Sequence, residues 1–125
     1  KNTWEPRSTK EGAVAVVVGI PKVGDEVLLD KEKEILTIPI LLELVKKPYL
    51  QEILPVGSKG ILYEAEEMGS TNNLKFIPNG KSPLDMKKSA GPATCAVVSV
   101  DESYIEELKG HCPLPVNRIG EFSNT

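Results

Sequence analysis

The most constraining feature of the sequence is an unbroken run of small and β-branched residues from Ala13 to Val18 (AVAVVV). A strand that is apolar at every position has no face to turn towards water, so this run predicts a central strand buried on both sides. Aromatic residues make up only 5% of the chain, so the core around this strand must consist mainly of Val, Ile and Leu. Other segments of the chain must cover both faces of the sheet.

Strand and helix patterns alternate after this run. Thr37 and Pro39 are suited to begin a helix, and Pro48 stops it. A second helix is predicted to end at Gly69, taken as the residue just past its last turn, and a third to begin at Asp101. The predicted helices cover residues 37–47, 61–68 and 101–110, and the predicted strands cover 13–18, 50–56, 74–77, 94–100 and 115–122. This order predicts an α/β (α+β) domain whose helices pack on a mixed sheet.

Length and charge limit the organisation and the partners of the chain. A chain of 125 residues forms one domain, preceded here by a polar, unperiodic stretch over residues 1–12 that reads as an N-terminal arm or linker. The net charge of −3 disfavours a nucleic-acid partner. No apolar run reaches the length of a membrane span, and no signal peptide is visible, so we expect no membrane partner and a cytoplasmic location.

The usual catalytic residues form no convincing constellation. Cys95 and Cys112 lack metal-ligand spacing and are expected to be reduced and buried, although the sequence leaves a disulfide open. His111 is the only histidine and is expected at the surface or at a helix end. Asp25 and Asp30 are weak candidates for Mg²⁺ binding beside a phosphate. We therefore predict no metal site and assign no catalytic residue.

The sharpest functional signal is the turn Gly57-Ser58-Lys59-Gly60, which lies between a predicted strand and a predicted helix. Amide groups at a helix N-terminus are unpaired and carry positive partial charge, and glycines let the backbone approach an anion closely. Lysine adds a full charge, so the turn is suited to phosphate. A tight turn with a solvated lysine is the structural alternative, because the spacing is not that of a phosphate-binding loop motif.

A second loop of the same composition, Gly19-Ile20-Pro21-Lys22-Val23-Gly24, follows the central strand. Ligands of α/β sheets bind at strand ends. If the two preceding strands point the same way, Lys22 and Lys59 lie at the same end of the sheet. A purely structural turn is the alternative for this loop taken alone. The predicted phosphate- or substrate-binding residues are Gly19, Lys22, Gly24, Gly57, Ser58, Lys59 and Gly60.

Three segments resemble the C-terminal domain of the aminoimidazole-ribonucleotide (AIR) synthetase-like superfamily, which includes selenophosphate synthetase, thiamine-monophosphate kinase and a hydrogenase-maturation dehydratase. They are AVAVVVGIPKVGDEVLL, LQEILPVGSKGILYEAEEMGSTNNLKFI and SPLDMKKSAGPATCAVVSVDESYIEELKGHCPLPVNRIGEF. The resemblance assigns residues 13–125 to that domain. It implies a layered α/β/α fold with partial ferredoxin-like topology, in which Gly19, Gly24, Gly57, Ser58 and Gly60 occupy the loop positions.

The resemblance also implies a role. In this superfamily an N-terminal domain supplies most ATP and metal ligands. The resemblance therefore implies such a partner domain, and it also implies a homodimer. It implies ATP and Mg²⁺ as cofactors of a full-length ligase-like or kinase-like enzyme, with no cofactor for this domain alone. This domain would complete the cleft for a small phosphorylated ligand. An acidic residue is usual where Gly57-Ser58-Lys59-Gly60 stands, so the turn favours direct anion binding over metal contact. A non-catalytic module that senses a nucleotide or metabolite, and a purely structural role, remain alternatives.

Overall fold

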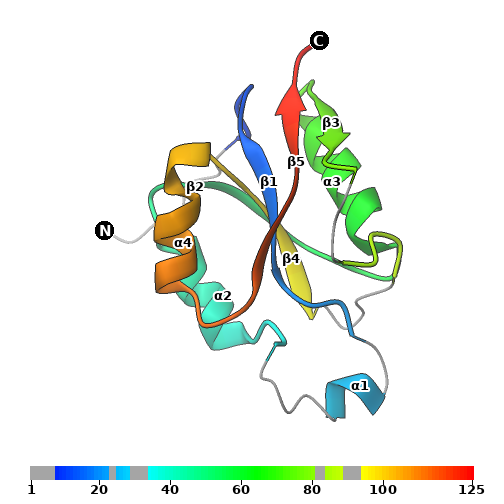
Figure 1. Ribbon diagram of the computed structural model, residues 1–125, viewed down its shortest axis with the longest axis vertical. Coiled ribbons are helices and arrows are strands. Elements are labelled where there is room, and N and C mark those ends of the chain that lie inside the picture. Colours follow the sequence, from blue (N-terminus) through cyan, green and yellow to red (C-terminus); the bar gives the residue numbers. More distant parts are fainter. Residues whose placement is uncertain (1–7, 23–24, 29–33, 81–83, 89–93) are drawn as a thin grey trace.

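The computed structural model describes residues 8–22, 25–28, 34–80, 84–88 and 94–125. Its centre is a five-stranded sheet with the strand order β2-β4-β1-β5-β3 (Figure 1). The strands are β1 (Val14–Gly19), β2 (Leu50–Pro55), β3 (Lys75–Pro78), β4 (Cys95–Val100) and β5 (Val116–Ser123). All six residues of β1 are buried, which confirms the central strand predicted from the AVAVVV run.

Helices cover both faces of the sheet, as Figure 1 shows. One face packs against α2 (Ile38–Val45) and α4 (Ile105–His111), and the other packs against α3 (Gly60–Thr71). Alternate residues of β1 enter the two cores: Val16 lies on the α2 and α4 side, and Val17 lies on the α3 side. The short helix α1 (Asp25–Leu28) follows β1, and the 3₁₀ turn η1 (Glu102–Tyr104) precedes α4. The predicted layered α/β/α domain is confirmed.

The sheet is antiparallel at every pairing, whereas the sequence predicted a mixed sheet. The helical crossovers do leave β1, β2 and β3 pointing the same way, because each of them runs opposite to a C-terminal strand. The C-terminal strands then insert between them: β4 lies between β1 and β2, and β5 lies between β1 and β3. This insertion produces the partial ferredoxin-like topology and removes every parallel neighbour.

The end of α3 differs from the prediction. Gly69 lies inside the helix, which continues to Thr71, and Asn73 supplies the left-handed backbone at φ 58°. A Cβ on Gly69 would lie 2.9 Å from the carbonyl oxygen of Leu74 and 3.3 Å from the amide nitrogen of Phe76. Gly69 therefore lets β3 pack closely against the helix. Asn72 and Asn73 end the helix instead.

Candidate functional site

The two glycine-lysine loops leave the sheet at the same end. Strand β1 ends at Gly19, opposite Cys95, and β2 ends at Pro55, opposite Ala96. Because both strands run antiparallel to β4, both loops lie beside the residue that begins β4. Strands β1 and β2 therefore point the same way, which is the condition for Lys22 and Lys59 to lie at the same end of the sheet. Gly24 lies outside the described residues.

Lys22 is held by contacts that the sequence did not reveal. Its ammonium nitrogen lies 2.9 Å from Oε1 of Glu34, and only 15% of its side chain is exposed. Its backbone N–H donates to the hydroxyl of Thr94, 2.8 Å away, and Thr94 is 1% exposed. An anionic ligand at Lys22 would therefore compete with Glu34. No local pattern signals these partners, because Thr94 is 72 residues from Lys22 along the chain.

Two of the predicted glycines are required by close packing of the backbone. Gly19 has φ +92°, and a Cβ there would lie 2.8 Å from the carbonyl oxygen of Thr94. Gly60 has φ +91°, and a Cβ there would lie 2.7 Å from the carbonyl carbon of Lys87. Both positions therefore exclude a side chain whether or not a ligand binds nearby.

Several amides at the start of α3 already have partners within the protein. The N–H of Gly57 donates to Oε2 of Glu64 at 3.3 Å, and the N–H of Gly60 donates to the carbonyl of Gly57 at 3.3 Å. The N–H of Leu62 donates to the carbonyl of Met86 at 2.7 Å. A phosphate at Gly57 would meet the Glu64 carboxylate first, so the turn offers fewer free donors than its sequence suggests.

Ser58 and Lys59 are the exposed residues of the Gly57–Gly60 turn. The ammonium of Lys59 lies 4.7 Å from the centroid of the Tyr63 ring, a cation–π contact that leaves the positive charge at the surface. Beside the turn, Lys88 forms an ion pair with Glu26 of α1 at 2.7 Å. Of the two predicted lysines, Lys59 is the one whose charge faces solvent.

The other reactive side chains that the structure describes form no second site. Burial raises the pKa of the Cys95 thiol to about 12 and also raises the pKa of Cys112. Both thiols are free and buried, as predicted, and they lie in the cores on opposite faces of the sheet. His111 is the last residue of α4, exposed, with its Nδ1 3.4 Å from the Tyr49 hydroxyl. The described part of the chain contains no cluster of three His, Cys, Asp or Glu residues able to hold a metal, and Asp30 lies outside it.

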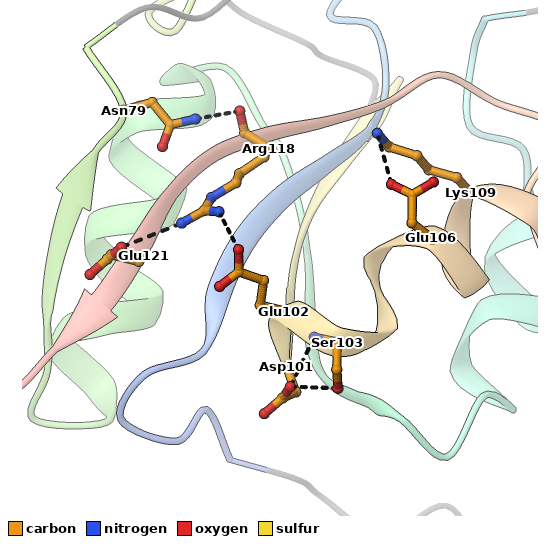
Figure 2. Close-up of polar contacts among 8 residues, drawn as sticks. All are labelled: Asn79, Asp101, Glu102, Ser103, Glu106, Lys109, Arg118 and Glu121. Carbon is orange, nitrogen blue, oxygen red and sulfur yellow. Dashed lines mark hydrogen bonds and ion pairs between the residues drawn. The ribbon is translucent and has the colours of Figure 1, made fainter.

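Arg118 of β5 is a charged group enclosed by acids (Figure 2). Its guanidinium contacts Glu102 of η1 at 3.0 Å and Glu121 of β5 at 3.4 Å. At the start of η1, Asp101 accepts hydrogen bonds from the backbone and hydroxyl of Ser103, which lower the pKa of its carboxyl group. Asp101 is the predicted helix cap, and this is confirmed. Because two carboxylates neutralise Arg118, it offers no anion site.

No described helix has both the length and the apolar composition to cross a bilayer.

The fold has clear relatives among solved structures. No family model and no curated protein matches the chain. The crystal structure of Escherichia coli HypE matches with a TM-score of 0.69 at 14% sequence identity, over 98% of this chain and 47% of that one. A chain of the HypE–HypF complex matches with a TM-score of 0.61 at 16% identity, over 95% of this chain and 49% of that one.

The chain thus spans about half the length of the structures that it matches. HypE is a hydrogenase maturation protein. The chain has the fold of the C-terminal half of HypE, which is the fold that the resemblance implied.

Proposed function

We propose that this chain is the C-terminal domain of an AIR synthetase-like, ATP-dependent protein and completes a cleft for a phosphorylated ligand. The observation that supports this most directly is the placement of the two glycine-lysine loops at the same end of the sheet, in a chain with the HypE fold. Strand ends are where ligands of sheet-and-helix domains bind. An N-terminal ATP-binding domain would form the other wall and hold ATP and Mg²⁺.

The roles of the two lysines differ in this proposal. Lys59 and Ser58 are exposed and would contact the phosphate directly. Lys22 is paired with Glu34 and would add its charge to the site only where the anion displaces that carboxylate. The backbone amides of the Gly57–Gly60 turn would complete the contact once Glu64 turns away from Gly57.

A role in packing against another domain or subunit is favoured by a separate observation. Ile38 and Leu42 of α2 are 68% and 54% exposed, one helical turn apart. Large apolar side chains grouped in this way often mark an interface. This surface is compatible with a homodimer or with an interdomain contact, and it accompanies the phosphate role without replacing it. A nucleotide-sensing module without catalysis is the alternative, and a full-length protein that lacks acidic metal ligands would favour it.

The test is a thermal-shift titration of the 125-residue chain with ATP·Mg²⁺, ADP, AMP and inorganic phosphate. A ligand at about 100 times its dissociation constant adds ~2.7 kcal/mol of stability. We expect stabilisation by at least one phosphate compound that Lys59→Ala removes and Lys22→Ala weakens. Lys75→Ala, an exposed lysine on β3, is the matched control and should change nothing. Equal stabilisation in all three variants, or none in the parent chain, would contradict direct phosphate binding by this domain.

A further inference from the structure

A hollow of about 330 Å³ lies between the edge strand β2 and helix α3. Leu54 and Met68 give it an apolar lining, and Tyr63 contributes an aromatic ring. Three carboxylates, those of Glu52, Glu64 and Glu67, line the same hollow. We refer to it as the β2–α3 groove.

The three carboxylates are not neutralised by neighbouring cations. Within the described part of the chain, none of them forms a salt bridge with a lysine or arginine. Glu52 accepts from neutral donors, the Thr9 N–H and hydroxyl and the Asn72 amide, and Glu64 accepts from the N–H of Gly57. Like charges gathered in one groove repel one another, so a cationic occupant is favoured.

The ring of Tyr63 already attracts a cation. The ammonium of Lys59 lies 4.7 Å from its centroid. This contact shows that a positive group is accommodated where the groove meets the Gly57–Gly60 turn.

The edge of β2 supplies main-chain hydrogen-bonding groups. Strand β2 has β4 on one side and no described strand on the other. The N–H of Val56 donates to the carbonyl of Cys95, so the register places the N–H and C=O of Leu54 towards β4 and those of Ile53 outward. An added extended segment can pair with Ile53. Pro55 and the irregularity between Leu50 and Glu52 confine pairing to this short stretch.

We infer that the β2–α3 groove binds an extended peptide segment with Lys or Arg at alternate positions, supplied by a partner protein. The segment would pair with the edge of β2 at Ile53, and its basic side chains on one face would reach Glu64 and Glu67. The six residues of β2 and the 12-residue helix α3 leave room for about five or six extended residues. The inference does not depend on phosphate binding at the neighbouring turn.

The test uses a fluorescein-labelled decapeptide of alternating Lys and Val, compared with one of alternating Glu and Val, in fluorescence polarisation titrations with the 125-residue chain. We expect only the Lys peptide to bind, and at least tenfold more weakly in 0.5 M than in 0.05 M NaCl. The double variant Glu64→Gln/Glu67→Gln should bind at least tenfold more weakly. Glu66→Gln, on the same helix but outside the groove, is the control and should bind as the parent does.

Strand pairing is tested on the peptide, which leaves the protein unaltered. Two N-methylated peptides are compared, one for each set of alternate residues. One of them should lose binding and the other should keep it, because only every second amide of a paired peptide faces Ile53. Equal loss in Glu66→Gln and the double variant, equal binding of the Lys and Glu peptides, or indifference to N-methylation in both registers would overturn the inference. So would a dimer of the chain itself that the double variant dissociates, because a second copy would then occupy the groove.

Discussion

At the scale of single residues, Gly19 and Gly60 stand where two backbone segments pass too close together for a side chain. The sequence around Gly19 and Gly60 predicts positions where the backbone approaches a phosphate. In the fold, the space beside each of them is filled by another segment, Thr94 at Gly19 and Lys87 at Gly60. Both uses require a glycine, and the distinction depends on a residue far away in the sequence. The need for glycine was therefore predictable, and the reason for it was not.

Gly60→Ala should destabilise the chain by about 1–3 kcal/mol, because φ +91° is strained for alanine and the new methyl group would meet the backbone of Lys87 at 2.7 Å. Gly110→Ala is the control: it lies in α4, a Cβ there would have nothing within 4 Å, and the change should stabilise the chain by up to about 1 kcal/mol. Urea denaturation of both variants measures the two changes. Equal stability of Gly60→Ala and the parent chain would show that the contact with Lys87 is not formed.

At the scale of elements, the predicted strands and most helix boundaries agree with the structure because they depend on local patterns: an apolar run, a proline, a capping aspartate. Predictions fail where contact with a distant segment determines the local structure. Gly69 looked like a helix end and is instead a point of contact with β3. The contact of Lys22 with Glu34 has the same origin. The candidate loops could be identified from sequence, but their internal partners could not.

The same dependence on distant partners holds for the polar cluster that ties residue Thr9 to the sheet. The buried Ser99 hydroxyl lies 2.7 Å from that of Thr9 and accepts the N–H of Glu52 at 3.0 Å. Ser99→Ala leaves these two groups without that partner, so we expect a loss of about 1–3 kcal/mol in the free energy of unfolding. Ser103→Ala, at an exposed position, tests whether loss of any hydroxyl has this effect. A loss as large in Ser103→Ala would contradict the assignment to burial.

At the scale of the whole molecule, the order of the strands makes the sheet depend on the end of the chain. The central strand β1 lies near the start of the sequence, but both of its neighbours, β4 and β5, come from the last third of the chain. Among the strands that the structure describes, β3 pairs with β5 alone. The two cores on either face of the sheet therefore cannot close until β5 is in place, which local strand patterns do not reveal.

Deleting residues 113–125 should prevent folding altogether. The deletion removes the partner of β3, one partner of β1, and the buried side chains of Ile119 and Phe122, which are 1% and 0% exposed. Each such side chain contributes about 1.5–3 kcal/mol, and the lost strand pairings add to this, against a total stability of about 5–15 kcal/mol for a typical domain. Circular dichroism should show no cooperative thermal transition in the truncated chain. Removing only Asn124 and Thr125, which are exposed, should leave the transition unchanged. A cooperative transition in the longer deletion would mean that β1, β2 and β4 form a stable sheet without β5, and that the two faces of the domain close independently.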